Sequence, residues 1–357
     1  MDDLHPGATL PNGISQRTIA DRIGVSVSTV SRVLSGHEAV SERTRSDVYR
    51  AIEELRGDSA PVPPRLATGK VIGLTNSHLT GGAYRSINDT MVQEILGGAE
   101  IAARERGYLV YTLHSSSLLI EPDSDPFFAA VRGVVMTGGI ISPQIVEAIR
   151  RHNLPIALVG GHMPGLPIPS VSGDAFHGVH LAVHHLAALG HRRIALVNGP
   201  SETYTSVERR GGYLTGLLEA GLPIDPALIR WTDGYDGFSA SAGQQSTVAL
   251  LDLPEPPTAI VFANDALAVG GQGICQQRGL RVPQDISIMG YDDNPLATAT
   301  TPHLTTLRVD RVAWGARAIH RLIDTLEGQQ QEAERLLMPV DLILRDSTGP
   351  APNPAAG

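Results

Sequence analysis

The sequence predicts a small all-α unit at the N-terminus, followed by an α/β core of two doubly wound parallel-sheet lobes. Residues 15–55 carry short helical patterns dense in charge, and residues 56–69 hold three prolines, as a linker does. From Lys70 onward, short apolar runs alternate with longer amphipathic stretches, which is typical of doubly wound α/β proteins. The 357 residues also exceed the roughly 250 to 300 at which single cores stop growing.

Three short helices are expected between residues 15 and 57, because apolar residues recur there at helical spacing. Gly24 falls where the first helix must turn sharply into the second, and Ser26 is a good N-cap for that second helix. If Val30 and Val33 face inward, the exposed side presents Val27, Ser28, Thr29, Ser31 and Arg32.

This exposed side is suited to reading DNA. Its small side chains let a helix approach base edges in the major groove, and Arg32 can pair with guanine. Arg17, Arg43 and Arg45 are placed for phosphates, and Ser41 can cap the third helix. Residues 15–57 hold seven arginines against six acids, a net charge of +1, so a two-fold dimer would be needed for strong binding. A plain three-helix cap with an arginine-bearing solvent face is equally consistent with the periodicity.

The core should contain seven strands buried on both faces, because seven apolar runs are continuous and end in Gly, Asn, Asp or a similar polar residue. The runs are VIGLTN (71–76), YLVYTLH (108–114), GVVMTGG (133–139), IALVGG (156–161), IALVNG (194–199), AIVFAND (259–265) and ISIMGYDD (286–293). Helical stretches lie between them at 91–107, 142–152, 178–190 and 266–279. The approximate doubling of this pattern predicts two similar lobes with a ligand cleft at the carboxyl ends of their strands.

Composition and motifs exclude several classes of protein. Cys275 is the single cysteine, which excludes an internal disulfide framework, and no apolar stretch reaches the roughly 18 residues of a membrane span. The start of the chain is acidic and broken by Pro and Gly, unlike a signal peptide, so a cytoplasmic protein without a membrane partner is expected.

No catalytic constellation or cofactor fingerprint is found, so neither an enzyme nor a bound cofactor is expected. His180 and His184 share a helix face, but the sequence places no cysteine or acid to complete a site, and no metal is expected.

The segment TIADRIGVSVSTVSRVLSGHEAVSERTRSDVYRAIEEL resembles the DNA-binding headpiece of the lactose/galactose repressor (LacI/GalR) family, most specifically in GVS-x-x-TVSRVL followed by VSERTR. The resemblance extends through DAFHGVHLAVHHLAALGHRRIALVNGP, VERRGGYLTGL, TAIVFANDALAVGG and GLRVPQDISIMGYDDNPLA. It implies a helix-turn-helix headpiece at 15–57, a linker or hinge at 58–69 and an effector-binding core at 70–347 with the fold of periplasmic binding proteins. Lobe 1 is expected at about 70–171 and 298–330, and lobe 2 at about 172–297 and 331–347, with a disordered tail at 348–357.

The predicted cleft carries groups suited to a polyol. Arg209, Asn264 and Asp292 lie where helix or strand ends would face it, and they offer donors and acceptors for vicinal hydroxyls. By resemblance, Arg209 and Asp292 match the ligand-clasping positions, Asn264 and Asp265 match the family's AND motif, and Phe238 matches a ring that stacks on a sugar.

Each of these residues also has a plainer interpretation. Asp265 and Asp293 could cap helices, Phe238 could belong to the core, and Arg209 could form a surface ion pair beside Glu208. Glycines at 160 and 161 replace an acid that sugar-responsive members frequently carry, so a small polar effector is expected rather than specifically a hexose.

The family's hinge helix inserts a leucine into the minor groove, and Leu66 occupies that position here. Pro63 and Pro64 precede it, so only about one helical turn is available and a stiff extended spacer is the alternative. The function expected is a homodimeric repressor that binds an operator with an inverted repeat and acts at the nucleoid. Its small, sugar-like effector would cause either induction or corepression. The alternative is a cytoplasmic small-molecule-binding protein or sugar-processing enzyme with a degenerate headpiece.

Overall fold

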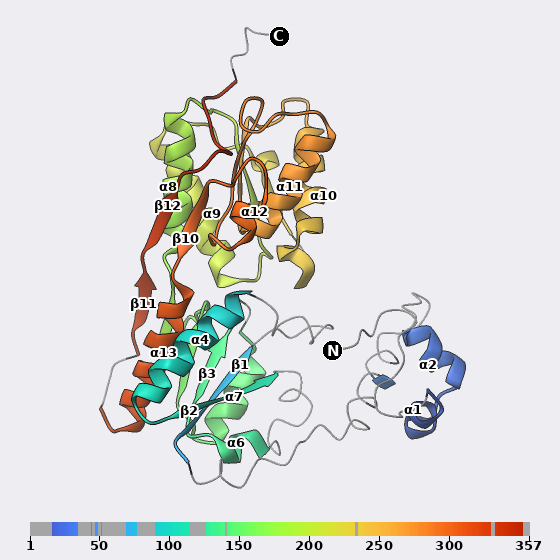
Figure 1. The fold of residues 1–357 in the computed structure, drawn as a ribbon, viewed down its shortest axis with the longest axis vertical. Coiled ribbons are helices and arrows are strands. Elements are labelled where there is room, and N and C mark those ends of the chain that lie inside the picture. The colour runs from blue at the N-terminus through green and yellow to red at the C-terminus, as the bar shows by residue number, and fades with distance from the viewer. Residues whose placement is uncertain are drawn as a thin grey trace. The chain divides into compact units, whose positions relative to one another are not determined.

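A computed structural model describes residues 16–34, 44, 47–48, 51, 69–76, 90–114, 126–139, 141–232, 235–329 and 333–352 (Figure 1). The chain divides into two compact units, Met1–Pro63 and Pro64–Gly357. None of the helices in the described ranges combines the length and the apolar character that a membrane crossing needs.

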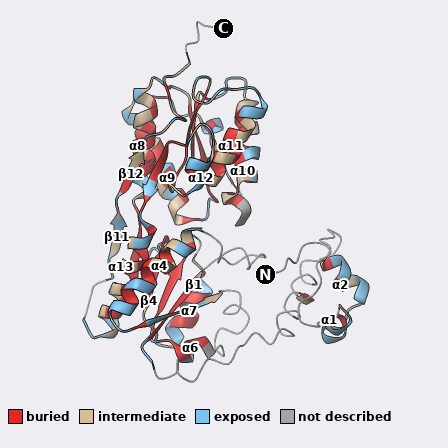
Figure 2. Cartoon of the chain, in the orientation of Figure 1, coloured by how far each residue is buried: buried red, intermediate tan, exposed pale blue. Residues whose placement is uncertain are grey.

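The first unit contains α1 (Gln16–Ile23) and α2 (Val27–Leu34), which close a miniature core. Ile19 and Ala20 of α1 pack with Val30 and Val33 of α2, and Val48, from the region of the predicted third helix, is buried with them. In Figure 2 the outward faces of both helices are coloured as exposed. The core therefore fixes which face of α2 points away from the unit.

Lobe 1 of the second unit is built on a six-stranded parallel sheet. Its strands, in their order across the sheet, are β11 (Arg335–Met338), β5 (Ser170–Gly173), β4 (Ile156–Val159), β3 (Val134–Thr137), β1 (Val71–Asn76) and β2 (Leu109–His114). The helices are α4 (Thr90–Glu105), α6 (Pro126–Ala130), α7 (Pro143–Arg151) and α13 (Arg311–Leu326). Helices α4 and α13 cross closely, because a Cβ on Gly98 would lie 1.9 Å from the Val312 carbonyl oxygen.

Lobe 2 is built on a four-stranded parallel sheet. Its strands, in order across the sheet, are β7 (Ile229–Trp231), β6 (Ile194–Asn198), β8 (Ala259–Phe262) and β9 (Ser287–Met289). Alternate strand residues pack in two separate clusters, one with α8 (Ala175–Ala188) and α9 (Tyr204–Glu219) and the other with α10 (Ala240–Leu251) and α11 (Asp265–Gln277). The two helix pairs cover opposite faces of the sheet, as Figure 1 shows. Short elements complete the lobe: η3 (Pro226–Leu228), η4 (Tyr235–Phe238) and α12 (Leu296–Ala299).

Three neighbouring segments connect the lobes. The first follows β5, and the Asp174 amide donates to the Met338 carbonyl at 2.9 Å. The other two are β10 (Thr306–Val309) and β12 (Val340–Ile343), which pair antiparallel with Val309 opposite Val340. The connecting segments are thus bonded to one another where the chain passes between the lobes.

The fold class predicted from the sequence is confirmed, and each of the seven apolar runs contains a strand of a parallel sheet. Two details of the predicted division are wrong. β11, expected in lobe 2, pairs in parallel with β5 and forms the edge of the lobe 1 sheet, because the chain returns to lobe 1 before β12. Leu304, expected in lobe 1, is buried in the lobe 2 core.

The predicted disordered tail is also wrong for residues 348–352. The Ile288 amide of β9 donates to the Ser347 carbonyl at 2.9 Å, and the Ser347 hydroxyl donates to the Ile288 carbonyl at 2.6 Å. The Gly349 amide donates to the Ser287 hydroxyl, and the Ala351 amide to the Leu189 carbonyl. The tail lacks an apolar period but supplies backbone partners to the edge of the sheet beside β9. Residues 353–357 lie outside the described ranges.

Candidate DNA-reading and effector-binding sites

The turn between α1 and α2 has the conformation that the sequence predicts. Gly24 has φ +69°, a conformation that glycine adopts without strain. The Ser26 hydroxyl accepts from the Thr29 amide at 3.1 Å, which is the N-cap bond of α2. The same hydroxyl lies 2.7 Å from the Ser28 hydroxyl, so polar groups gather at the start of the helix.

The outward face of α2 presents small polar side chains and one arginine. Val27, Ser28, Ser31 and Arg32 are exposed, and Thr29 is half-buried. Arg17 of α1 and Ser26 are also exposed. The other residues predicted to contact DNA, which are Ser41, Arg43, Arg45 and Leu66, lie outside the described ranges.

In the core, Arg209 is the most unusual of the predicted effector-binding residues. It lies on α9, is only 7% exposed, and its guanidinium sits 4.7 Å from the centroid of the Tyr291 ring. Within the described part of the chain, its Nε and Nη1 atoms have no hydrogen-bond partner. Burial lowers the pKa of this guanidinium, against the opposing effects of Tyr291 and Asp292. Arg209 does not form the surface pair considered above, since Glu208 pairs with Arg335 at 3.3 Å.

Asp292 lies near Arg209 in a strained turn after β9. Its φ is +115° and that of Asp293 is +58°, conformations that favour glycine and cost of order 1–3 kcal/mol each. The Asp292 carboxylate pairs with Arg311 of α13, and Arg311 also donates to Glu94 of α4 at 3.1 Å. An aspartate of lobe 2 is therefore ion-paired to a buried arginine of lobe 1.

Asp293 does not cap a helix. Its carboxylate accepts from Arg308 at 2.7 Å and from Arg345 at 2.5 Å. Arg308 and Arg345 pair with Asp293, whereas Arg311 pairs with the preceding residue, Asp292. The turn at the end of β9 is thus fixed by charges on β10 and on the segment after β12.

The side chains of Asn264 and Asp265 are hydrogen-bonded within lobe 2. The Asn264 side chain caps α11 by accepting from the Leu267 amide at 2.8 Å, and it donates to the Phe238 carbonyl at 3.0 Å. Asp265 is fully buried and accepts from the Thr306 hydroxyl at 2.6 Å and the Asn294 amide at 2.9 Å.

The negative charge of Asp292 acts electrostatically on Asp265. Burial, followed by the negative charge of Asp292, raises the pKa of Asp265 to about 7. A ligand that moves the Asp292 carboxylate would therefore also change the pKa of the buried Asp265 carboxyl.

Phe238 is half-buried and packs against the lobe 2 core. A Cβ on Gly199 would lie 2.4 Å from its ring, so the ring rests on the backbone at the end of β6. Phe238 therefore packs on the lobe 2 core, as the plainer interpretation predicts. It is only partly buried, so it also leaves apolar surface at the carboxyl end of the sheet.

A second group of contacts between the lobes was not predicted. Arg335 of β11 donates to the Tyr204 hydroxyl and lies 4.5 Å from the centroid of the Tyr204 ring. His162 packs edge-on to the same ring at 5.3 Å. Arg335 and Arg311 lie outside the motifs that carry the family resemblance. Their contacts with lobe 2 depend on how the two lobes are arranged, which the sequence alone does not show.

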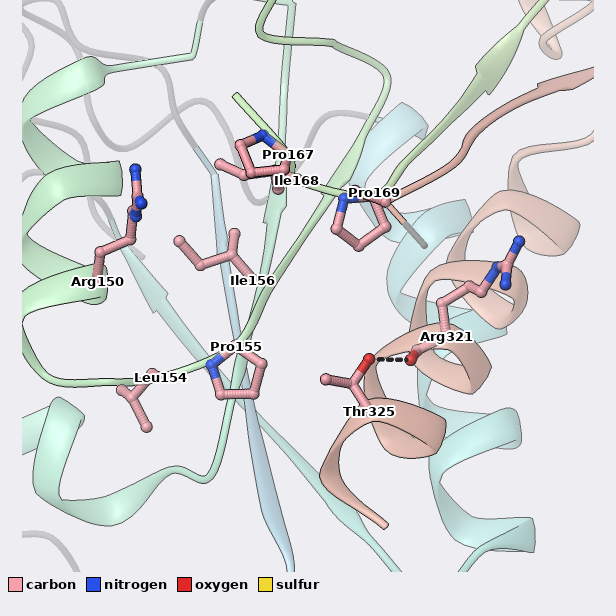
Figure 3. A pocket seen from close by; sticks show the side chains of 10 residues that line it. Arg150, Leu154, Pro155, Ile156, Pro167, Ile168, Pro169, Arg321 and Thr325 are labelled. Carbon is pink, nitrogen blue, oxygen red and sulfur yellow. Dashed lines mark hydrogen bonds between the residues drawn. The ribbon is translucent and has the colours of Figure 1, made fainter. Parts of the chain in front are cut away.

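A separate hollow of about 260 Å³ lies in lobe 1, at the amino end of β4 and beside α13 (Figure 3). Its walls are mostly apolar, with three prolines and two isoleucines, and Arg150 and Arg321 lie at the sides. None of the predicted effector residues lines it, so it is not the site built around Arg209.

Comparisons with known proteins place this geometry in a family. The model described as "Bacterial regulatory proteins, lacI family" matches residues 17–56, and that described as "Periplasmic binding protein-like domain" matches residues 183–348. The HTH-type transcriptional repressor CytR of Escherichia coli (strain K12) is 30% identical over 348 residues, covering 95% of this chain and 97% of the repressor. The chain belongs to the LacI family of bacterial regulatory proteins.

Other LacI-family regulators are similar to this chain over nearly its whole length. The HTH-type transcriptional regulator AglR of Rhizobium meliloti (strain 1021) is 31% identical, covering 95% of this chain and 96% of AglR. A CelR–cellobiose complex has a TM-score of 0.70 and 27% identity over 94% of this chain and 99% of CelR. A lac repressor dimer bound to operator and the anti-inducer ONPF has a TM-score of 0.68 and 28% identity over 95% of this chain and all of that one. This LacI-family member is accordingly a DNA-binding transcriptional regulator, so the predicted family and the predicted regulatory role are confirmed.

Proposed function

We propose that this chain is a homodimeric repressor that reads an inverted-repeat operator through α2 and senses a small, polar, sugar-like molecule in the core. The observation that carries the effector part is Arg209: a buried guanidinium with two unpartnered nitrogens, 4.7 Å from the Tyr291 ring centroid. Such a group costs free energy until a ligand oxygen accepts its hydrogen bonds. The Tyr291 ring keeps the guanidinium plane in place for a polyol.

The coupling between ligand and DNA is proposed to run through the Asp292 turn. A ligand that contacts Arg209 and Asp292 changes the charge balance at the Asp292–Arg311 pair, which joins the two lobes. It thereby binds two lobe arrangements unequally and shifts their populations. In a dimer this shift changes the spacing of the two headpieces, and operator affinity falls on induction or rises on corepression.

The relatives support a sugar-like ligand and argue against an enzyme. CelR is described with cellobiose, and a LacI-family regulator from Enterococcus faecium is described with bound ribose. The curated relatives are named as transcriptional repressors and regulators. Binding to chromosomal operators would place this protein at the nucleoid in the cytoplasm.

The DNA-reading part is tested by first recovering the operator. Purified protein is incubated with fragmented genomic DNA at two salt concentrations, and the bound fragments are sequenced. A short inverted repeat with salt-dependent affinity is expected. Binding without sequence preference, or a pure monomer in a mass measurement at micromolar concentration, would contradict the proposal.

Two arginine variants then separate base reading from phosphate contact. Arg32→Ala is expected to lower affinity for the operator and relax its sequence preference, by about 1–3 kcal/mol at the contacted position. Arg17→Ala should weaken binding to all sequences alike and reduce the salt slope by about one charge. Arg210→Ala, an exposed arginine in lobe 2, is the control and should leave DNA binding unchanged. Equal behaviour of the three variants would refute the assignment of α2 as the reading helix.

A further inference from the structure

Helices α8 and α9 lie unusually close together in lobe 2. A Cβ on Gly212 would lie 2.0 Å from the Phe176 carbonyl oxygen, and a Cβ on Gly216 would lie 2.9 Å from Val183 Cβ. The glycines of α9 therefore let its backbone approach α8. As a consequence, the last residue of α9, Glu219, reaches side chains on α8 that are far away in sequence.

Those side chains are the two histidines of α8. His180 and His184 are four residues apart, so they lie on one face of the helix. His180 Nε2 lies 2.7 Å from Glu219 Oε2, and His184 Nε2 lies 2.9 Å from the same oxygen. The sequence alone shows the histidine pair, whereas the fold supplies the acid that completes a three-ligand set.

We propose that His180, His184 and Glu219 bind a divalent transition-metal ion of the zinc class. The three potential ligand atoms all lie within 4.8 Å of one another. Two imidazole nitrogens and one carboxylate oxygen are ligands that zinc accepts at about 2.0–2.2 Å, with a fourth position left for water. Tetrahedral coordination at those lengths needs ligand atoms about 3.3 Å apart, so a small movement of the half-exposed Glu219 side chain makes room for the ion.

The surroundings favour this geometry. Phe176, one turn earlier on α8, stacks with the His180 ring at 6.2 Å, which restrains the ring. His180, His184 and Glu219 have side-chain exposures of 22%, 42% and 52%, so an ion can reach them from solvent. Glu219 lies ten residues along α9 from Arg209, about 15 Å at 1.5 Å per residue, so the ion site is separate from the effector site.

A bound ion would tie the end of α9 to the middle of α8. Metal that binds only the folded form stabilises it, and this effect grows with the free ion concentration. The proposed role of the ion is therefore to hold the end of α9 against α8.

The test uses the full-length protein without a histidine tag, stripped of metal by a chelator. Zn²⁺ is titrated in competition with a chromophoric chelator, and Co²⁺ is added separately to record the visible spectrum of a tetrahedral site. One Zn²⁺ per chain is expected with micromolar or tighter affinity. At about 100 times the dissociation constant, the unfolding midpoint should rise by roughly 5–10 °C.

Matched variants decide whether the site is built as proposed. Glu219→Gln should weaken Zn²⁺ binding at least 10-fold and remove the tetrahedral Co²⁺ spectrum, and His184→Ala should abolish micromolar binding. His177→Ala removes a neighbouring histidine outside the set and should change the affinity less than 2-fold. An unchanged affinity in Glu219→Gln would overturn the proposal by showing that a helical histidine pair alone binds the ion. Loss of binding in His177→Ala, or no binding below millimolar Zn²⁺ in the wild type, would overturn it as well. Circular dichroism of each metal-free variant checks that it folds.

Discussion

Replacing Arg209 with methionine is expected to make the unliganded protein more stable while removing its response to the effector. The wild-type side chain buries two nitrogens without hydrogen-bond partners in the described structure, and each costs about 1–3 kcal/mol. Stacking on Tyr291 stabilises the buried guanidinium by about 0.5–2 kcal/mol, and the nearby Asp292 charge offsets part of the remaining cost. The net gain expected for methionine, which can also pack on the Tyr291 ring, is about 1–3 kcal/mol.

The assay is thermal unfolding by calorimetry, with and without each member of a panel of mono- and disaccharides. The midpoint of the unliganded Arg209→Met protein should rise by roughly 2–10 °C, and no sugar that shifts the wild type should shift the variant. Arg210→Met, a substitution of the exposed neighbour, is the control and should change the free energy of unfolding by less than about 0.5 kcal/mol. A lower midpoint for Arg209→Met would refute the reasoning, because it would mean that the guanidinium is already satisfied without a ligand.

Two further substitutions test the packing and the electrostatics of lobe 2. Gly212→Ala should lower the unfolding midpoint by several degrees, about 1–3 kcal/mol, because its Cβ would meet the Phe176 backbone at 2.0 Å. Gly211→Ala is the matched control: its Cβ meets only the movable Phe176 ring at 3.1 Å, so equal losses in both variants would contradict the close helix crossing. For Asp265, the folded pKa of about 7 lies above the ordinary 3.8, so the folded protein holds an extra proton between those values and loses stability as the pH rises through that window. Asp265→Asn can keep both hydrogen bonds and does not titrate. Its advantage over the wild type in the free energy of unfolding should therefore grow by about 2–3 kcal/mol from pH 5 to pH 8, and an advantage that does not grow with pH would sink this interpretation.

Much of the fold could be predicted because it depends on local patterns. Runs such as IALVNG are apolar at every position, which happens where a strand is covered on both faces, and these runs became strands of the two sheets. β5, with sequence SVSG, was not predicted because its serines are buried without an apolar signal. β11 was assigned to the wrong lobe because strand pairing, unlike strand formation, depends on contacts distant in sequence.

The candidate sites divide in the same way. The exposed face of α2 follows from helical period alone, since burying Val30 and Val33 leaves Ser31 and Arg32 outside. The effector site does not follow from period, because its charges come from separate elements. The role of Asp265 depends on Thr306, and no local pattern indicates that its two oxygens are already used.

The return of the chain to lobe 1 also sets the order in which the sheets can be completed during synthesis. Strands β6 to β9 of lobe 2 lie in one continuous stretch, Ile194–Met289. The lobe 1 sheet begins at Val71 but lacks its edge strand until Met338 has left the ribosome. Since domains form as their residues emerge, the sheet that starts later in the sequence is the first that can be finished. The nascent lobe 1 must therefore wait, with the β5 edge unpaired and without α13, while the whole of the other sheet is made.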